Sequence, residues 1–399
     1  MSTSASDGIS GSLLWLRQAS GPFLERAHLA AIEPDLLVGC AESEIQAEFS
    51  TSGTTENPVR VRYTTRLFDS LAEILTRFYQ RTGLGTDSRV ALGYGVDGAA
   101  YQMHAAGLRR AGIRFYAIDP ADPEATHHAL ATGGATALFA RASLALQLAA
   151  LADRRPANEL AGLTLVLSSG MPLSDPGRDW IDRTLGVTTL RCAGATEVSL
   201  LALECQERSG MHLVSELLDA ELLPFPLEPS PHAVVQTRVS ELVVTTLRNA
   251  ACPLRRYRLG DLVTVAGEPC PCGSTAPRLE IVGRVADAVA LPGGQQLYAA
   301  SIQTAVDRVS GLTGGFQCTV DPFKQPLAFR LEVEAWSTGE DVPRRVIDQV
   351  APVLSRALGS RFASRKPRLT VVLCPPGYLG WGGVKYRRIL VRRTPDPGA

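Results

Sequence analysis

The stretch RVALGYGVDGAAYQMHAAGLRRAGIRFYAI, residues Arg89–Ile118, decides the fold class. Its first six residues form a short apolar run typical of a buried strand, and its last six alternate like a strand. The segment Ala99–Ala111 between them has apolar residues at helical spacing. A strand, a helix and a second strand in this order form a crossover unit with the two strands parallel in one sheet. The stretch therefore predicts an α/β fold.

The same alternation continues to Cys192. We expect helices at His127–Thr132, Ser143–Ala152 and Asp179–Leu185, and strands at Thr136–Ala140, Leu163–Leu167 and Thr188–Cys192. Strands that alternate with helices of this length favour a largely parallel sheet. Ligands of such sheets bind at the carboxyl ends of the strands, which is where the Gly/Ser/Thr-rich turns of this sequence fall.

The flanking segments have other patterns. Helical spacing is present at Leu13–Ala31, Thr65–Thr82, Ser301–Val309 and Val346–Leu358. Strands are expected at Asp219–Leu223, Ser240–Thr246, Leu262–Val265, Phe316–Val320, Ala328–Glu334 and Arg368–Leu373. The strands after Glu216 lack intervening helices and indicate a β-subdomain, whereas the segment from Val285 onward mixes helices and strands in a compact α+β unit.

The length of 399 residues favours two domains, because single cores stop growing well below this size. We predict a large N-terminal domain, residues 1–284, with mixed, mostly parallel sheets and a β-subdomain. A small, mobile α+β domain, residues 285–399, follows. The hinge between them is expected near Gly283–Asp287.

Charge and apolar content exclude several partners. Lys plus Arg and Asp plus Glu are both 40, so no basic surface points to nucleic acid. The longest apolar stretches, such as Leu144–Leu151, are far shorter than the roughly 20 residues that span a bilayer. Met1–Gly11 lacks the pattern of a signal peptide, and eight cysteines are too sparse for a disulfide scaffold. We therefore expect a cytoplasmic protein that binds neither nucleic acid nor membrane.

The segment STSGTTENP, Ser50–Pro58, is dense in hydroxyl groups and contains one glycine. Side-chain O–H and backbone N–H groups of such a loop can wrap a polyphosphate. It is not a Walker A loop, because the Gly-Lys-Ser/Thr ending is missing. By itself, the segment could equally be a Ser/Thr-rich surface turn.

Further motifs follow the loop in a fixed order. They are Ala193–Glu197, Glu241–Leu247, Arg256–Leu262 and Gly283–Arg284. Loop and motifs together resemble the adenylate-forming ligase superfamily, and Thr245–Leu247 with Pro253–Leu254 looks most like its phenylacetate–CoA ligase branch. The resemblance covers about Phe49 to Arg388. It implies an AMP-forming acid–thiol ligase that uses ATP and Mg²⁺ to activate a small, aromatic carboxylic acid and then transfers the acyl group to coenzyme A.

The resemblance also implies roles for individual residues. Those that would bind the nucleotide are Thr51, Ser52, Gly53, Thr54, Thr55, Ser169, Gly170, Met171, Ala193, Gly194, Ala195, Asp261 and Arg284. Thr196 would contact the α-phosphate, and Glu197 would ligate Mg²⁺, a hard cation that prefers oxygen ligands. Asp261 would accept hydrogen bonds from the ribose. Lys385 matches the C-terminal lysine that reaches the carboxylate and the α-phosphate, although a lysine in so basic a segment could simply be solvated.

The chemistry of adenylation agrees with these residue types. A carboxylate attacks the α-phosphorus while pyrophosphate leaves, so catalysis consists mainly of positioning and charge neutralisation. The resemblance also implies that Tyr94, Gly95, His104 and Ala105 line the acid pocket, although His104 could equally be a buried core histidine. A homodimer is a further expectation.

Several positions depart from the family pattern. Ala193 stands where an aromatic residue usually packs on adenine, Met171 replaces a frequent glutamate, Glu56 replaces a glycine and Ala286 replaces the hinge aspartate. These departures favour a divergent branch such as natural-product biosynthesis. They leave three alternatives open. The chain could pass the acyl group to an amine or carrier protein, use another nucleophile such as nitrite, or be a catalytically degenerate nucleotide-binding homologue.

Three cysteines and a histidine form a second group of candidate ligands. Cys205 and His212 make one pair, and Cys270 and Cys272 make another around a proline. Three thiolates and an imidazole suit a closed tetrahedral Zn²⁺ site, which would be structural. The alternative is four unrelated reduced residues. The other five cysteines are expected to be small core residues.

Overall fold

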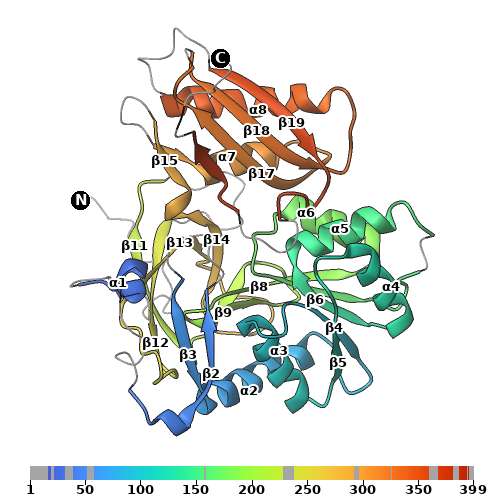
Figure 1. Ribbon diagram of the computed structural model, residues 1–399, viewed down its shortest axis with the longest axis vertical. Helices are drawn as coiled ribbons and strands as arrows, with labels where there is room; N and C mark the ends of the chain where they lie inside the picture. The colour runs from blue at the N-terminus through green and yellow to red at the C-terminus, as the bar shows by residue number, and fades with distance from the viewer. Residues whose placement is uncertain are drawn as a thin grey trace, which may run out of the picture. The chain divides into compact units, whose positions relative to one another are not determined.

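The computed structural model describes residues 17–18, 22–31, 39–51, 58–156, 159–227, 238–291, 296–324, 326–358, 367–380, 386–392 and 394 (Figure 1). The chain divides into two units. The first comprises Met1–Asp87, Asp97–Ile113 and Leu190–Val282, and the second comprises Ser88–Val96, Arg114–Thr189 and Gly283–Ala399. One boundary thus lies at the predicted hinge, but the second unit also holds two earlier segments. The division into domains of residues 1–284 and 285–399 stays a prediction.

The second unit contains the predicted parallel sheet. Its strands lie in the order β5 (Arg114–Ala117), β4 (Arg89–Gly93), β6 (Ala137–Arg141) and β7 (Leu165–Ser169), and each neighbouring pair is parallel. The connecting helices of this unit are α4 (Pro123–Gly133), α5 (Ala142–Ala152) and α6 (Asp175–Leu185). Buried alanines and leucines of α5 pack against β6 and α6. The α/β prediction is confirmed.

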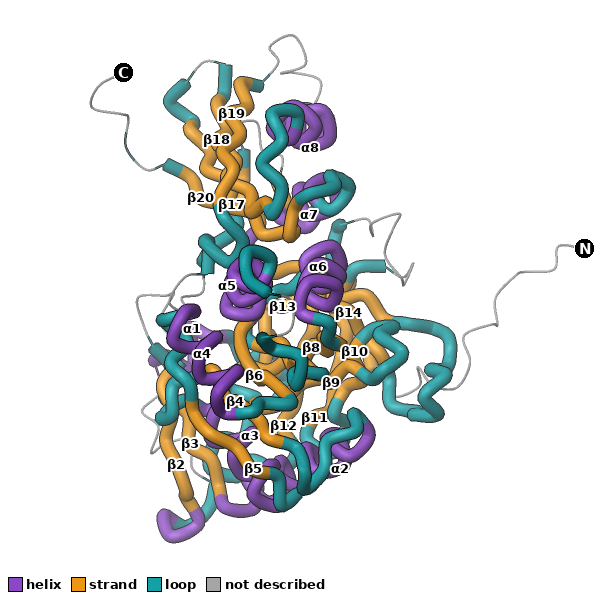
Figure 2. Tube along the Cα trace, turned by 90° about the vertical axis from the view of Figure 1, so that its right-hand side faces the viewer, coloured by secondary structure: helices purple, strands orange, loops and turns teal. Residues whose placement is uncertain are grey.

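A smaller sheet follows in the same unit. Its order is β19 (Arg368–Cys374), β18 (Ala328–Ala335), β17 (Leu312–Asp321) and β20 (Ile389–Val391). Figure 2 shows α7 (Ala299–Val306) and α8 (Val342–Leu358) on one side of this sheet, where they bury a shared core. Pro352 lies inside α8. Directly before α7 along the chain are a short turn, η4 (Val285–Asp287), and the hairpin of β15 (Ala288–Ala290) and β16 (Gln296–Tyr298).

The first unit is built mainly from strands. The order is β1 (Arg17–Gln18), β11 (Leu218–Pro224), β12 (Ser240–Thr246), β13 (Tyr257–Val265), β14 (Arg278–Arg284), β10 (Met211–Leu213), β9 (Ser199–Glu204) and β8 (Thr188–Ala195). Most of its assigned pairs are antiparallel, as expected for a β-subdomain. The unit also contains α1 (Arg26–Ala31), η3 (Glu42–Glu44) and the hairpin of β2 (Ile45–Ser50) and β3 (Arg60–Thr64).

Two helices of the first unit, α2 (Thr65–Arg81) and α3 (Ala99–Arg110), pack closely against each other. A Cβ atom at Gly107 would lie 2.7 Å from the Cβ atom of Leu75, so only glycine permits this approach. Thr64 caps α2, because its hydroxyl accepts a hydrogen bond from the N–H of Leu67. This packing fixes the face of α3 that carries His104.

Several elements differ from the sequence-based expectations. Within the segment expected to be helical, Leu13–Ala31, Arg17–Gln18 pairs with β11 instead, and the described helix is only α1. The strands β9, β10 and β14 were not expected. The strand expected at Thr188–Cys192 extends to Ala195, just before Thr196 and Glu197. The strand expected at Leu262–Val265 begins earlier, at Tyr257, so Asp261 lies within β13. Of the three unexpected strands, β10 has only three residues and β9 is buried throughout, so neither shows an alternating pattern. Most of β14 is partly buried, and it shows no alternation either.

Candidate functional site

The ends of the predicted phosphate loop are held together by β2 and β3. Ser50 is opposite Arg60, and the backbone N–H of Thr51 donates to the carbonyl of Val59 at 2.9 Å. The Thr51 hydroxyl accepts the N–H of Val59, also at 2.9 Å, and Thr51 is buried. Ser52, Gly53, Thr54 and Thr55 lie outside the described residues. The hairpin thus holds together the two ends of the segment in which the sequence predicts the phosphate loop.

Thr196 and Glu197 occupy the tight turn between β8 and β9. Gly194 makes this turn possible, because a Cβ atom there would lie 2.3 Å from the carbonyl oxygen of Ser199. Tyr63 donates its hydroxyl hydrogen to the carbonyl of Thr196 at 2.8 Å. Tyr63 is itself buried against the rings of Phe49 and Phe68, so the turn rests on the aromatic core beneath the phosphate-loop hairpin.

Glu197 is buried, and its carboxylate has two partners from distant segments. Arg26 of α1 forms an ion pair with it, and the Tyr257 hydroxyl lies 3.4 Å from its Oε1 atom. Burial, followed by the charge of Glu197, raises the pKa of Tyr257, so this phenol stays a hydrogen-bond donor. The carboxylate predicted to bind Mg²⁺ is therefore held in place.

Arg26 joins the two predicted parts of the site. Besides pairing with Glu197, its Nη2 atom donates to the Thr51 hydroxyl at 2.8 Å. Sequence reasoning missed this residue, because it belongs to none of the family motifs and its helix has only six residues. Thr51, the Thr196–Glu197 turn and Arg26 thus come together within the first unit.

The remaining nucleotide candidates of the first unit lie on strands. Asp261 is buried in β13 directly after Gly260, whose φ of +79° is a conformation that glycine adopts readily. Ala193 is buried in β8 opposite Ala202, and Ala195 ends that strand. Arg284 is exposed at the end of β14 and belongs to the second unit.

The second unit gathers further candidates at the carboxyl edge of its parallel sheet. The hydroxyls of Tyr94, after β4, and Ser169, at the end of β7, are 2.8 Å apart. Gly170 follows with φ of +73°, and Met171 is partly buried while Gly95 is exposed. The contact between Tyr94 and Ser169 brings two of these candidates together at this edge.

The two other acid-pocket candidates, His104 and Ala105, are fully buried on α3. The Nδ1 atom of His104 lies 2.8 Å from the hydroxyl of Tyr79 on α2. Burial lowers the pKa of His104 to about 3, so its imidazole is neutral at pH 7. This environment is that of a core histidine, and its part in an acid pocket stays a prediction.

Lys385 lies outside the described residues, but the segments around it are described. Arg388 places its guanidinium 5.2 Å from the centre of the Phe316 ring, and β20 begins at Ile389. In the hinge segment Ala286 is exposed, whereas Asp287 is buried and its pKa is raised by desolvation.

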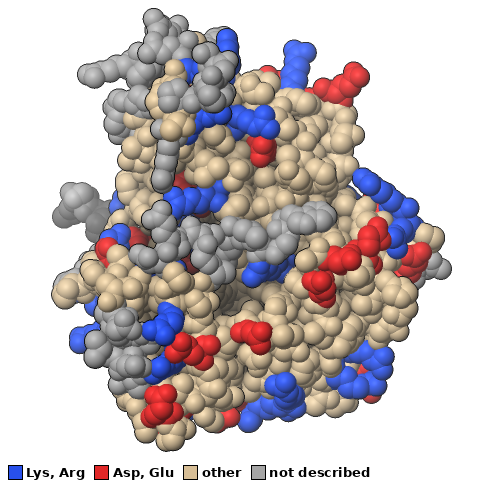
Figure 3. All heavy atoms as spheres, in the orientation of Figure 1, with Lys and Arg blue, Asp and Glu red and all other residues tan. Residues whose placement is uncertain are grey.

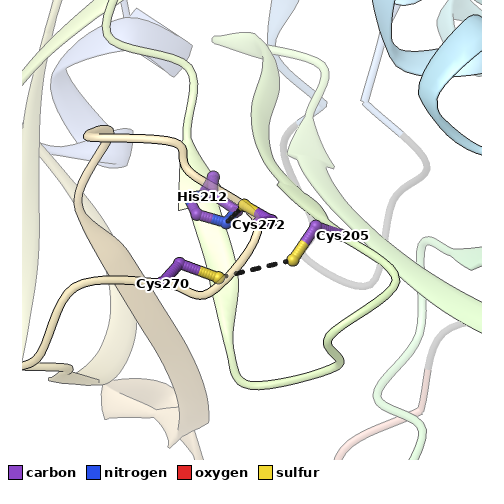
Figure 4. Close-up of side chains that lie close together, drawn as sticks. All are labelled: Cys205, His212, Cys270 and Cys272. Atoms are coloured by element: carbon purple, nitrogen blue, oxygen red, sulfur yellow. Dashed lines mark hydrogen bonds between the residues drawn. The ribbon is translucent and has the colours of Figure 1, made fainter.

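The four metal-ligand candidates converge in the first unit, as Figure 4 shows. Cys205 follows β9, His212 lies in β10, and Cys270 and Cys272 lie between β13 and β14. Their ligand atoms all lie within 4.8 Å of one another. The sulfurs of Cys205 and Cys270 are 3.6 Å apart, and the Cys272 sulfur is 3.4 Å from the His212 Nε2 atom.

These distances agree with a tetrahedral zinc site. Bonds of about 2.3 Å to sulfur and about 2.0 Å to nitrogen keep two sulfurs about 3.8 Å apart, and a sulfur and a nitrogen about 3.5 Å apart. The Nδ1 atom of His212 lies 3.1 Å from the carbonyl of Ala276. Since a carbonyl only accepts, Nδ1 carries the hydrogen and Nε2 keeps its lone pair for a metal.

The other cysteines behave largely as expected. Cys192, Cys252, Cys318 and Cys374 are buried, and Cys40 is partly exposed.

Charged side chains of both signs are interspersed over the face shown in Figure 3. Among the described helices, none combines the length and the hydropathy that a membrane-spanning segment needs.

Comparison with known proteins supports the resemblance. No family model matches the chain. It is 27% identical over 388 residues to a phenylacetate–coenzyme A ligase of Thermus thermophilus, covering 92% of this chain and 86% of that protein. It is 24% identical over 278 residues to the Escherichia coli protein of the same name, covering 68% of this chain and 62% of that protein.

Solved structures share the fold. A 2-hydroxyisobutyryl-CoA ligase in complex with 2-HIB-AMP superimposes with a TM-score of 0.74 at 21% identity, over 94% of this chain and 81% of that one. ATP-bound MatB from Rhodopseudomonas palustris superimposes with a TM-score of 0.57 at 15% identity, over 84% of this chain and 65% of that one. The α/β fold and the resemblance inferred from the sequence motifs are confirmed.

Proposed function

We infer that the chain is a ligase of the adenylate-forming superfamily, related to the phenylacetate–coenzyme A ligases. We propose that it adenylates a small aromatic carboxylic acid with ATP and transfers the acyl group to coenzyme A. The observation that carries this proposal is the convergence of Thr51, Glu197 and Arg26. Two of them come from separate motifs of the family, and they meet at one point of the first unit.

The roles of the residues follow from their chemistry. Ser52, Gly53, Thr54 and Thr55 would bind the phosphates through hydroxyl and N–H groups, as would Thr51. Thr196 would donate to the α-phosphate from the turn that Tyr63 supports. Asp261 and Arg284 would bind the ribose side of the nucleotide. Each of these groups positions ATP for in-line attack by the carboxylate.

Glu197 fits the expected Mg²⁺ in donor type, because it is a buried carboxylate with the Tyr257 hydroxyl beside it. The ion, when bound, neutralises charge on the phosphate oxygens. Glu197 would hold it, and Tyr257 would keep the carboxylate oriented. Lys385 would neutralise the charge that builds on the reacting carboxylate and α-phosphate.

We also propose that Cys205, His212, Cys270 and Cys272 bind one structural Zn²⁺. All four tetrahedral positions are then filled by the protein, so the ion takes no part in the reaction. The Arg81 guanidinium donates to the Cys272 carbonyl at 3.4 Å. Its positive charge offsets the net negative charge of three thiolates and Zn²⁺.

The proposal is tested by measuring pyrophosphate release over a panel of aryl acids, with and without coenzyme A. We expect acid-dependent release and an acyl-CoA product. Glu197→Gln should lower release at least a hundredfold, whereas the exposed Glu44→Gln should not change it. Release that yields no thioester would point to an amine, a carrier protein or nitrite as acceptor. ATP binding without release for any acid would contradict an enzymatic function.

A further inference from the structure

Arg141 ends the central strand β6 at the carboxyl edge of the parallel sheet. The register places Ala140 opposite Gly93 of β4, and Arg141 itself opposite Ser169 of β7. Tyr94, which follows Gly93, therefore leaves the sheet on one side of Arg141, and Ser169 leaves it on the other.

Two contacts build a frame around this arginine. The hydroxyls of Tyr94 and Ser169 meet at 2.8 Å, although their strands lie on opposite sides of β6, so their hydrogen bond spans the end of that strand. A Cβ atom at Gly170 would lie 3.7 Å from the Cγ and Nε atoms of Arg141. The arginine side chain therefore runs along the backbone of Gly170, at the edge where ligands of open α/β sheets bind.

The charge of Arg141 is uncompensated within the described part of the chain. Its side chain is partly buried, and burial lowers its pKa, opposed only by the phenol of Tyr94. No carboxylate pairs with it there. Two other partly buried arginines do have a carboxylate, since Arg191 pairs with Glu204 and Arg256 with Glu221, whereas Arg89 donates to the carbonyl of Gly133. A desolvated cation without a partner is costly and favours an incoming anion.

We propose that Arg141 is a specificity-determining residue that binds an anionic oxygen group on the acid substrate, distinct from the carboxylate that is activated. The substrate class is then a small acid with a second carboxylate or similar oxyanion. The planar guanidinium forms paired hydrogen bonds with such a group. This inference rests on the proposed function, because it uses Tyr94 and Gly95 as lining of the acid pocket.

The test compares matched acids, phenylacetate and 4-carboxyphenylacetate, and butyrate and succinate. For the wild type we expect kcat/KM for pyrophosphate release to favour the diacid of at least one pair. Arg141→Gln should lower that preference roughly ten- to hundredfold, since a hydrogen bond to a charged group is worth about 1.5–3 kcal/mol. Arg141→Lys should retain part of the preference. The exposed Arg154→Gln is the matched control and should retain all of it.

Direct binding separates this inference from the proposed function. Thermal shifts with each acid in the absence of ATP should be larger for the diacid in the wild type and equal for both acids in Arg141→Gln. No pyrophosphate release with any acid would sink the proposed function, whereas the thermal shifts would still report on Arg141. The inference would be overturned if wild type and Arg141→Gln preferred the diacid to the same degree. It would also be overturned if Arg141→Gln raised only the KM for ATP, because Arg141 would then bind a phosphate of the nucleotide.

Discussion

The guanidinium of Arg26 pairs with the carboxylate of Glu197 across 171 positions of sequence. The Glu197 side chain is 7% exposed and that of Arg26 is 33% exposed, so the carboxylate is the buried member of the pair. Because the same guanidinium also donates to Thr51, α1 ties the phosphate-loop hairpin to the Thr196–Glu197 turn. A segment outside every family motif therefore shapes the centre of the candidate site.

Arg26→Ala should destabilise the protein, because it leaves Glu197 buried without its counter-ion. Solvent reaches Arg26, so the full penalty of a broken buried pair is not expected, and we expect a loss of about 1.5–3 kcal/mol in the free energy of unfolding. Urea denaturation measures it. Arg77→Ala is the control, since Arg77 pairs with the exposed Glu73 on α2 and should cost less than about 1 kcal/mol. Equal losses in both variants would show that the pair with Glu197 is not special.

The fold could be predicted wherever the chain has a regular pattern. The strand Ser240–Thr246 was predicted at its observed bounds. In contrast, β10 has three residues and β9 is buried throughout, so neither shows alternation. Arg17–Gln18 pairs with β11 despite a helical pattern around it, because a tertiary partner overrides local spacing.

The site was predictable to the extent that its residues carry their own chemical signal. The spacing of Cys270 and Cys272 by itself indicates a metal site, and the Thr196–Glu197 pair is part of a family motif. Arg26 and Arg141 carry no such signal, since an isolated arginine is usually solvated. Only the register of β6 and the partners of α1 reveal what surrounds them.

His104 should make stability depend on pH. Its pKa is 6.5 in the unfolded chain and about 3 in the folded protein, so below pH 6.5 the unfolded state binds a proton that the folded state does not. The contribution of His104 to the free energy of unfolding is therefore fully present above pH 6.5 and should fall by about 1.4 kcal/mol for each pH unit well below it, down to about pH 3. Urea denaturation of the wild type and of His104→Gln at pH 7 and pH 5 measures this, and the variant should lose less. The control is His28→Gln, which changes an exposed histidine and should behave like the wild type. If the free energy of unfolding of His104→Gln fell between pH 7 and pH 5 as much as that of the wild type, His104 would not be the cause of the pH dependence.

The purified protein should contain about one Zn²⁺ per chain. Sites of three thiolates and a histidine bind zinc with roughly 10–16 kcal/mol, so loss of a ligand should lower the melting temperature while ATP affinity changes little. Elemental analysis and thermal unfolding of Cys272→Ser measure both effects. Cys40→Ser, which changes a partly exposed cysteine outside the cluster, is the control. Wild-type protein prepared without chelator and found free of zinc would remove the metal from the site.

Lys385→Ala should slow adenylation selectively. In the adenylating arrangement its ammonium would bridge the attacking carboxylate and the α-phosphate, and a donor of this kind is worth about 2.7–4 kcal/mol. Pyrophosphate release should therefore fall roughly a hundred- to thousandfold. ATP binding should stay nearly intact, because Asp261 and the Ser50–Thr55 segment would hold the nucleotide.

The second half-reaction separates this role from a structural one. A preformed acyl-adenylate supplied to Lys385→Ala should still be consumed by the acceptor, since thioester formation would not need the lysine. Arg387→Ala is the matched control, because Arg387 is exposed. Arg388→Ala is less suitable, because Arg388 packs on Phe316 and its loss would disturb the smaller sheet. If Lys385→Ala releases pyrophosphate at the wild-type rate, the alignment of the C-terminal motif is wrong and another cation must complete the site.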